Sequence, residues 1–353
     1  MGRKKEKTGE SEMYAAVFYQ SRRLLVENLP MPEPKDDQVV LQVMACGVCG
    51  TDVHIYEGDE GAAQTPAGTV LGHEFSGVVT AVGPAVSGFR PGHRVCVDPN
   101  KLCGICDYCR SGMGHFCQHM TGIGTTVHGG FAEYCAVPQS QVYHIPDWVT
   151  FEQAAMTEPV ACCLHGIDLC GVSCGDTVMV IGGGMIGLTM VQLARLSGAG
   201  RVILSEPVES KRALAKQLGA DLCLDPLEGD LPSQLRQAGV GRVGVVIECA
   251  GRTETMAQAV ACAGNKATVM LFGLTKPSDQ MPVYPFQLFK KELTLKTSYI
   301  NPYTQKRALD LIGSGRIDVS SMVYQTAPLE RLAAILSDPA LRSKGKWIIL
   351  PNG

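Results

Sequence analysis

Four cysteines in one short segment of the chain have the spacing of a metal site. They are Cys103, Cys106, Cys109 and Cys117, in the pattern C-x2-C-x2-C-x7-C. Four thiolates on one loop can complete a tetrahedron around Zn²⁺ and leave no open position for chemistry. Two local disulfides or four buried free thiols are the alternatives, but spacing this tight without a secretion signal favours a metal. The segment therefore predicts a structural zinc site.

A second set of metal-binding and proton-transfer side chains is dispersed along the chain. It comprises Cys49, Thr51, His54, His73, Glu74, Glu158 and Cys162. Taken alone, each member has an ordinary structural interpretation. Cys46 and Cys49 could be core thiols or a redox C-x-x-C pair, His73 a hydrogen-bonded interior histidine, and Glu158 a helix cap. The set indicates a catalytic metal site only in combination with a suitable fold.

A glycine-rich segment lies in the second half of the chain. It contains G-x-G-x-x-G at Gly182, Gly184 and Gly187, between an expected strand and an expected helix. Such a loop directs backbone N–H groups and the positive end of a helix toward a pyrophosphate. Three glycines could also simply form a tight turn, so the strand and helix around them carry the prediction of a dinucleotide site.

An acidic residue follows the next expected strand. Glu206 lies 19 residues after Gly187, where a carboxylate can accept hydrogen bonds from both hydroxyls of an adenosine ribose. The same carboxylate would repel a 2′-phosphate, which favours NAD over NADP. Lys211 and Arg212 lie close by in the sequence and leave some room for a phosphate.

Composition bounds the fold that must position these groups. The chain has 353 residues, enough for about two compact domains. Hydrophobic residues make up 45%, which excludes a disordered chain, and 31 Lys plus Arg against 34 Asp plus Glu give no sign of nucleic-acid binding. No apolar run is long enough to span a membrane, and residues 1–12 are expected to form a mobile polar tail. Fifteen cysteines without a secretion signal indicate a reducing, cytoplasmic compartment.

The two halves of the chain differ in their expected secondary structure. Residues 13–162 contain short β-rich runs separated by Gly and Pro, which predict a barrel-like domain. Residues 163–299 alternate apolar strands with helices, which predicts a doubly wound parallel sheet covered on both faces. Residues 300–353 return to a mixed pattern and are expected to belong to the first domain, with a last strand over 346–350. The strands expected in the second half are Asp176–Ile181, Arg201–Ser205, Gly244–Glu248 and Ala267–Leu271, and the helices are Met185–Ser197 and Val208–Leu218.

Together these motifs resemble the zinc-dependent medium-chain alcohol and polyol dehydrogenases. The resemblance spans nearly everything after residue 13 and follows the order of motifs in the family. It rests on Cys49–His54, Gly72–Gly77, the four-cysteine loop, Gly129–Tyr134, Glu158–Pro159 and the glycine motif. It implies an α/β protein with a β-rich GroES-like catalytic domain and a Rossmann doubly wound cofactor domain. The Glu-Pro pair is similar to that of the sorbitol, butanediol and threonine dehydrogenase branch.

The resemblance implies a ligand set for a catalytic zinc ion. Cys49 and His73 would bind the metal, Glu74 would be a ligand or lie close behind one, and Glu158 would bind directly or through water. Ethanol-type members use a cysteine near the position of Cys162, so either Glu158 or Cys162 could complete the shell.

The resemblance implies further roles on both sides of the reaction. Thr51 would accept the proton that the substrate releases, and His54 could pass it outward, whereas Cys46 matches a packing position. The expected cofactor-binding residues are Gly182, Gly184, Met185, Ile186, Gly187, Glu206, Lys211, Arg212, Phe272 and Leu274.

The implied reaction is the reversible, NAD-dependent oxidation of a secondary alcohol to a ketone, by formation of a zinc alkoxide and transfer of hydride to nicotinamide. A polyol, a vicinal diol or a hydroxy-amino acid fits this class. Sorbitol-type enzymes carry an arginine where this chain has Tyr299 or Ile300, which departs from a true sorbitol site. The alternatives are a zinc-independent quinone or enoyl reductase relative and a non-catalytic, zinc-stabilised NAD-binding regulator. The expected partners are a small-molecule substrate and copies of the chain in a dimer or tetramer, with no nucleic acid and no membrane.

Overall fold

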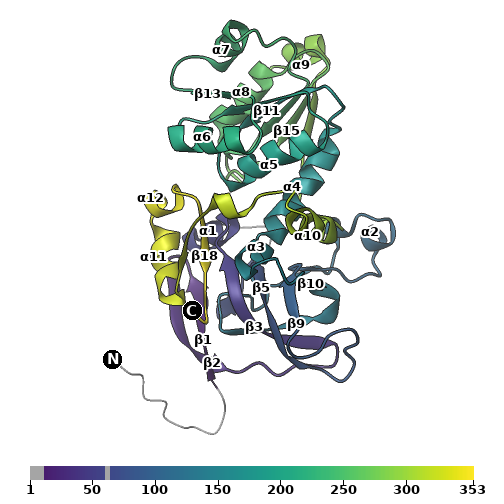
Figure 1. Cartoon of the computed structure of the whole chain (residues 1–353), viewed down its shortest axis with the longest axis vertical. Helices are drawn as coiled ribbons and strands as arrows, with labels where there is room; N and C mark the ends of the chain where they lie inside the picture. Colours follow the sequence, from purple (N-terminus) through teal and green to yellow (C-terminus); the bar gives the residue numbers. More distant parts are fainter. Residues whose placement is uncertain (1–11, 60–63) are drawn as a thin grey trace. The chain divides into compact units, whose positions relative to one another are not determined.

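The computed structural model describes residues 12–59 and 64–353 (Figure 1). Residues 1–11 of the expected polar tail lie outside the described residues, and Glu12, which was also assigned to that tail, begins the first strand. The chain divides into two compact units. The first comprises Met1–Glu158 and Val323–Gly353, and the second comprises Pro159–Met322.

The unit boundaries differ from those expected at residues 162 and 300. Residues 300–322 belong to the second unit because polar side chains tie them to it. Thr304 Oγ1 donates a hydrogen bond to Ala161 O at 2.7 Å, and Gln192 Nε2 donates to Asp318 O at 3.1 Å. These bonds link segments more than 100 residues apart, so the local sequence pattern could not indicate them.

The first unit is built mainly of β-strands, as its short β-rich runs predict. A seven-stranded sheet has the order β10-β6-β5-β3-β18-β17, with β9 also pairing with β3, and a three-stranded sheet has the order β2-β1-β4. A short pair, β7-β8, stands apart. The last strand pairs with β3, so its predicted place in the first domain is confirmed. The strands are β1 (Glu12–Gln20), β2 (Arg23–Pro30), β3 (Gln38–Gly47), β4 (Thr69–Val70), β5 (Glu74–Val82), β6 (Arg94–Val97), β7 (Asn100–Lys101), β8 (Thr121–Gly122), β9 (Tyr134–Pro138), β10 (Val142–His144), β17 (Val323–Ala327) and β18 (Lys346–Ile349).

Short helices connect these strands and carry part of the chemistry. They are α1 (Gly50–Glu57), α2 (Asp107–Arg110), α3 (Phe151–Ala155), α11 (Leu332–Ser337) and α12 (Pro339–Arg342). The inward faces of the sheets form one core that includes Leu41, Phe75 and Phe131, each almost completely buried. This core holds the end of β3 and the start of β5 in place. The candidate metal ligands lie at or next to these two strand ends.

The second unit contains a six-stranded parallel sheet in the order β13-β12-β11-β14-β15-β16. This is the doubly wound order of dinucleotide-binding folds, whose ligand site lies at the carboxyl ends of the strands where the order reverses. The reversal falls between β11 and β14. The strands are β11 (Thr177–Ile181), β12 (Arg201–Ser205), β13 (Leu222–Leu224), β14 (Val245–Glu248), β15 (Thr268–Leu271) and β16 (Thr294–Thr297).

Five helices join successive strands of this sheet and two more flank it in the sequence, and the predicted strands and helices are confirmed to within two residues at their ends. The helices are α4 (Thr157–Cys170), α5 (Met185–Leu196), α6 (Glu209–Gln217), α7 (Leu231–Gln237), α8 (Thr253–Cys262), α9 (Pro285–Lys291) and α10 (Gln305–Gly313). Among the described residues, no helix combines the length and apolar character needed to cross a membrane.

Candidate functional site

Three of the dispersed ligand candidates converge in the first unit. The donor atoms of Cys49, His73 and Glu74 all lie within 4.8 Å of one another. Cys49 immediately precedes α1, His73 precedes β5, and Glu74 is the first residue of β5. His73 and Glu74 are buried, while Cys49 is half-buried, so one side of the cluster is reachable from outside. A thiol, an imidazole and a carboxylate form a donor set that suits Zn²⁺.

A buried carboxylate orients two members of this cluster. Asp52, which is 0% exposed, accepts a hydrogen bond from Cys49 N at 2.8 Å through Oδ2. Its Oδ1 faces His73 Nδ1 at 3.4 Å, which leaves Nε2 of the imidazole for a metal. Burial lowers the pKa of His73, but the carboxylate of Asp52 and then Cys49 raise it by more, so the pKa lies well above its ordinary value in the metal-free chain.

A buried cation lies behind Glu74. Lys346 of β18 forms an ion pair with Glu74, and both side chains are almost fully buried. Burial lowers the pKa of Lys346, while Glu74 and Cys49 raise it by more, so the lysine stays charged. Gly47 makes room for this pair, because a Cβ there would lie 2.2 Å from Glu74 Oε2.

The charges of the cluster fit a divalent cation. In the metal-bound form, where the ligands are deprotonated, Asp52, Glu74 and the Cys49 thiolate would carry three negative charges, His73 would be neutral and Lys346 would carry one positive charge, so a net charge of −2 would face the divalent ion. Glu74 Oε1 is buried without a hydrogen-bond partner among the described residues. Uncompensated buried charge is costly, so the cluster is balanced when a Zn²⁺ ion takes the remaining lone pairs.

The roles of two other expected ligands stay predictions. Neither Glu158 nor Cys162 belongs to the group of donor atoms within 4.8 Å, although both lie on α4. Cys46 is fully buried in the core of the first unit, as its predicted packing role requires. Burial raises the pKa of Cys46 well above its ordinary value, so it remains a neutral thiol at neutral pH.

The expected proton-transfer residues lie on α1, beside the cluster. Thr51 Oγ1 is 3.8 Å from Cys49 Sγ. His54 is one turn farther along the helix and half-exposed, and its Nδ1 lies 3.1 Å from Asp59 Oδ2. The hydroxyl of Thr51 thus lies at the cluster, and the imidazole of His54 lies farther along the helix, nearer to solvent.

The four-cysteine loop brings its thiols together as predicted. Cys103, Cys106, Cys109 and Cys117 form a second group whose sulfurs all lie within 4.8 Å of one another. Backbone N–H groups of Cys109 and Gln118 lower the pKa of Cys106 to about 6, whereas burial and then Cys106 raise the pKa of Cys109 to about 12. Without a metal the four thiols cannot all ionise, and a bound Zn²⁺ removes that conflict.

The glycine loop joins β11 to α5 in the second unit. Gly182 has a φ of +99°, and a Cβ on Gly187 would lie 1.8 Å from Gly182 O, so the turn requires glycine at both positions. The first hydrogen bond of α5 runs from Leu188 N to Gly184 O at 2.9 Å. The N–H groups of Met185, Ile186 and Gly187 therefore have no acceptor within the helix and can bind an anion.

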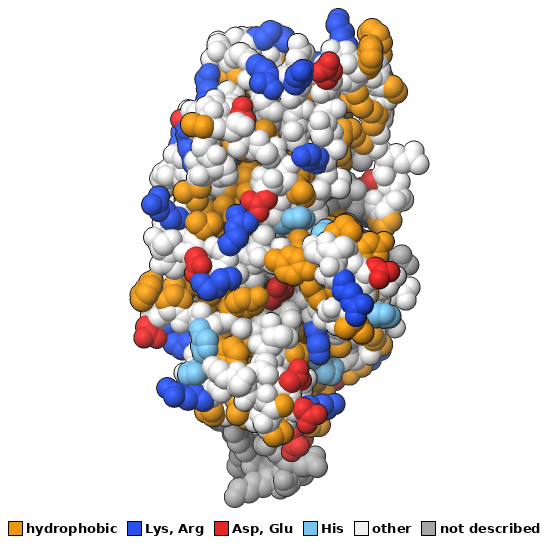
Figure 2. All heavy atoms as spheres, turned by 90° about the vertical axis from the view of Figure 1, so that its right-hand side faces the viewer, with side chains coloured by type: hydrophobic (Ala, Val, Ile, Leu, Met, Phe, Trp, Pro, Cys, Tyr) orange, Lys and Arg blue, Asp and Glu red, His pale blue; other side chains and the backbone are white. Residues whose placement is uncertain are grey.

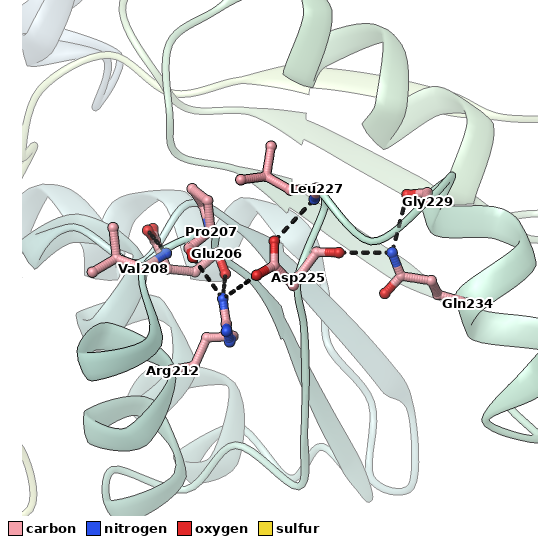
Figure 3. A network of polar contacts seen from close by, with 8 residues as sticks. All are labelled: Glu206, Pro207, Val208, Arg212, Asp225, Leu227, Gly229 and Gln234. Carbon is pink, nitrogen blue, oxygen red and sulfur yellow. Dashed lines mark hydrogen bonds and ion pairs between the residues drawn. The ribbon is translucent and has the colours of Figure 1, made fainter.

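Glu206 lies against this loop, at the carboxyl end of β12. Its Oε2 accepts from Gly183 N at 2.6 Å. Its Oε1 accepts from Val208 N at 2.9 Å (Figure 3). Each carboxylate oxygen keeps a lone pair for a ribose hydroxyl. Arg212 Nη1 donates to Glu206 O and contacts Asp225, so this guanidinium is engaged within the protein. Lys211 is half-buried beside it.

The two remaining cofactor candidates lie after β15. Phe272 N donates to Glu248 O at 3.0 Å, and the Phe272 ring packs close to Gly166 of α4. Leu274 is 60% exposed. No contact of these side chains singles out a cofactor role, so that role stays a prediction.

Three buried charged residues around the sites were not anticipated from the sequence. Asp52 could have been found, because an acid three residues after Cys49 is a helix-capping spacing. Lys346 carries no such signal, since its partner Glu74 is 272 residues away in the sequence. Glu248 ends β14, and its Oε1 accepts from Ala250 N at 2.8 Å and Gly251 N at 2.9 Å, which anchors the loop at the sheet's reversal point.

Two glycines of the loop provide a matched pair of variants. Gly187→Ala forces a Cβ against Gly182 O, so we expect the free energy of unfolding to fall by about 1–3 kcal/mol. Gly184 has a φ of −73° and its Cβ would meet open space, so Gly184→Ala should cost less than about 1 kcal/mol. If the open space holds a pyrophosphate, Gly184→Ala should still weaken NAD⁺ binding about tenfold.

Denaturant unfolding and titration calorimetry separate the two effects. A Gly184→Ala protein that is stable and binds NAD⁺ like the wild type would contradict a pyrophosphate site at this loop. A Gly187→Ala protein with unchanged stability would contradict the close approach of α5 to β11.

Two family models and a relative of known name match the chain. Residues 35–147 match the alcohol dehydrogenase GroES-like domain, and residues 186–314 match the zinc-binding dehydrogenase domain. The chain is 30% identical to sorbitol dehydrogenase from Bacillus subtilis (strain 168) over 351 residues, which covers 98% of this chain and 99% of that protein.

Two solved structures are similar over almost the whole chain. A zinc-binding dehydrogenase from Sinorhizobium meliloti 1021 bound to NADP has a TM-score of 0.93 and 39% identity, covering 97% of this chain and 100% of that chain. An Escherichia coli CFT073 protein described as a short chain alcohol dehydrogenase, complexed with NADH, has a TM-score of 0.88 and 29% identity, covering 96% and 99%.

The chain belongs to the zinc-dependent medium-chain alcohol and polyol dehydrogenase family. It is an NAD(P)- and zinc-dependent oxidoreductase that converts secondary alcohols and ketones into one another. The predicted family, the pairing of a GroES-like with a Rossmann domain, and the reaction class are confirmed. The alternatives of a zinc-independent reductase and of a non-catalytic regulator find no support.

Proposed function

We propose that Cys49, His73 and Glu74 hold the catalytic zinc ion and that the substrate is a polyol, a vicinal diol or a hydroxy-amino acid. The observation that carries this proposal is the convergence of a thiol, an imidazole and a carboxylate, whose donor atoms lie within 4.8 Å of one another in a cluster that keeps one half-buried side. When bound, a zinc ion with three protein ligands supplies an open position and acidifies the hydroxyl group of an alcohol. Asp52 holds the imidazole of His73 in the orientation that presents Nε2.

The protein's own groups take up the proton that the alcohol releases. Thr51 Oγ1, beside the cluster, is placed to accept it, and the half-exposed His54 is placed to pass a proton from its ring to solvent. Asp59 orients His54 through Nδ1, which leaves Nε2 free for exchange with water. The ion pair with Lys346 engages one oxygen of Glu74, and the other oxygen is placed to act as a ligand.

In the second unit the glycine loop and Glu206 suit a dinucleotide. The N–H groups of Met185, Ile186 and Gly187 would bind the pyrophosphate, and Glu206 would accept the ribose hydroxyls. The similar structures include one with NADP and one with NADH, so their cofactors do not decide the preference. The carboxylate of Glu206 supports a preference for NAD.

Metal content and turnover test this function together. Purified, unchelated protein should contain two zinc ions per chain, one for each cluster, by mass spectrometry of the metal. It should reduce NAD⁺ with members of a panel of polyols, vicinal diols and hydroxy-amino acids, followed by the absorbance of NADH. One zinc ion per chain with no turnover on any secondary alcohol would overturn the proposal.

We also propose that the chain forms a homo-oligomer through one edge of its parallel sheet. β16 is one of the two edge strands of this sheet, so its outer N–H and C=O groups can pair with another strand. The adjacent segment exposes large apolar side chains, with Phe286 at 72% and Phe289 at 79%, and Figure 2 shows hydrophobic side chains gathered at the top of one face. A second copy of the chain would cover this surface.

Polar substitutions on α9 test this interface. Phe286→Asp combined with Phe289→Asp should reduce the mass in light scattering to that of a monomer, because two charges would face the partner. Trp148→Ser, which changes another highly exposed aromatic, in the first unit, should leave the mass unchanged. A wild-type protein that is monomeric at micromolar concentration would contradict the interface.

The cysteines support a reducing, cytoplasmic location. All fifteen lie within the described residues, and none is in a disulfide. Both metal-binding clusters need free thiolates, and cysteine thiols stay free in compartments where they are kept reduced. The partner is then a small metabolite with a CH–OH group.

A further inference from the structure

We infer that Asp225 determines the cofactor specificity of this chain by neutralising Arg212 beside the adenosine ribose site. The inference rests on the proposed dinucleotide site at the glycine loop and deepens it. Sequence position alone makes Arg212 a candidate partner for a 2′-phosphate, because it follows Glu206 by six residues. The structure shows that contacts within the protein engage the Arg212 guanidinium.

The contacts of Arg212 show that one end of its guanidinium is fully used. Nη1 donates to Glu206 O and to Pro207 O, each at 2.7 Å, and lies 2.9 Å from Asp225 Oδ2 (Figure 3). Nη1 carries two hydrogens, so three acceptors leave it no donor for a ligand. The side chains of Arg212 and Asp225 are 19% and 14% exposed, so water screens this pair weakly.

Three hydrogen bonds hold Asp225 and the loop that follows it in place. It follows β13, and its Oδ1 accepts from Leu227 N at 2.9 Å. Gln234 of α7 donates to Asp225 O at 2.7 Å and to Gly229 O at 3.0 Å. The loop after β13 is thereby fixed so that the carboxylate faces Arg212. A neutral partner at this position would satisfy the same turn without cancelling the charge.

The charges around the ribose position then favour a hydroxyl over a phosphate. Glu206 and Asp225 contribute two negative charges, and Arg212 contributes one positive charge that is already paired. A 2′-phosphate brings about two more negative charges, which this group of residues repels. Lys211 remains as a half-buried cation nearby, so a weak phosphate interaction persists. Removing the charge of Asp225 brings the sum of these three charges from −1 to 0, so the net repulsion of a 2′-phosphate is lost.

Asp225→Asn isolates this effect. Asparagine keeps an oxygen for Leu227 N, so the turn is retained while the charge is lost. Asp221→Asn is the matched control: it removes the same charge from just before β13, where Asp221 pairs with Arg195 at the opposite, amino-terminal end of the strand. Both variants change the net charge of the unit equally.

Titration calorimetry with NAD⁺, NADP⁺, 2′-AMP and 5′-AMP provides the readout, with no need for turnover. In Asp225→Asn we expect NADP⁺ and 2′-AMP to bind about tenfold more tightly, because the positive charge of Arg212 is no longer compensated by a paired carboxylate. NAD⁺ and 5′-AMP should stay within about twofold of the wild type. Asp221→Asn should change none of the four. Adding Arg212→Gln to Asp225→Asn should abolish the gain.

The possible outcomes distinguish a failure of this inference from a failure of the proposed cofactor site. Unchanged binding of NADP⁺ and 2′-AMP in an Asp225→Asn protein that still binds NAD⁺ would overturn the inference alone. An equal gain in Asp221→Asn, or a gain that survives Arg212→Gln, would also overturn it, because net charge or another cation would then be responsible. Wild-type protein that binds neither dinucleotide would overturn the proposed cofactor site, and the inference with it.

Discussion

Cys49→Ser is expected to reduce turnover at least about a thousandfold while the protein stays folded. Serine keeps the shape of the side chain but not its charge, since its hydroxyl is neutral at pH 7. The cluster would then hold a net charge of −1 instead of −2 against a divalent ion, and it would lose its sulfur donor. NAD⁺ binding should persist, because the glycine loop and Glu206 lie in the other unit.

Three measurements on the same samples check this expectation. Zinc content should fall from two ions to one per chain, the NADH signal with any secondary alcohol should vanish, and the calorimetric affinity for NAD⁺ should be unchanged. Cys46→Ala is the control, because Cys46 is a buried neutral thiol three residues earlier and outside the donor group. It should keep both zinc ions and most turnover. A Cys49→Ser protein that retains turnover would refute the assignment of this cluster.

The parallel sheet of the second unit could be predicted closely because its strands are buried on both faces. Continuous apolar runs such as Val178–Ile181 and Val202–Leu204 leave little choice of structure, and the glycine loop marks where the first strand ends. The expected return to the first unit at residue 300 was wrong by more than 20 residues. The bonds from Thr304 and Asp318 that retain this segment join distant parts of the chain, and no local pattern records them.

The candidate sites also differ in how far the local sequence predicts them. The four-cysteine loop is contained in 15 residues, so spacing alone indicates that its thiols meet. Cys49 and His73 meet because β3 and β5 pair side by side, which the family resemblance supplied and their spacing did not. Lys346 and Asp225 act as partners of charges elsewhere in the fold. Their roles become visible only when strands and loops are placed in space.

These partners have a common effect, which is to set how much charge each site presents. Lys346 reduces the negative charge around the catalytic cluster to the amount that one divalent ion balances. Asp225 cancels the cation nearest to the ribose end of the glycine loop. The ligand residues determine the type of chemistry, and these buried counter-charges determine which ion or cofactor binds.

Cys106→Ser is expected to lower the stability of the first unit strongly and to leave the catalytic cluster able to bind zinc. A closed four-thiolate site contributes its binding free energy to folding, so its loss should lower the melting temperature by about 10 °C or more. Cys106 is the most sensitive choice, because backbone N–H groups lower its pKa to about 6 and its thiolate is therefore the readiest to bind metal at neutral pH.

Calorimetric scans and metal analysis distinguish this effect from damage at the catalytic cluster. Zinc content should fall by one ion, turnover per remaining zinc should stay near the wild type below the melting transition, and an added chelator should lower the wild-type melting temperature toward that of Cys106→Ser. Cys174→Ser, at an exposed cysteine outside both clusters, should change none of these values. An unchanged melting temperature in Cys106→Ser would mean that the loop folds without a metal, since a closed thiolate site that binds zinc cannot lose a ligand at no cost in stability.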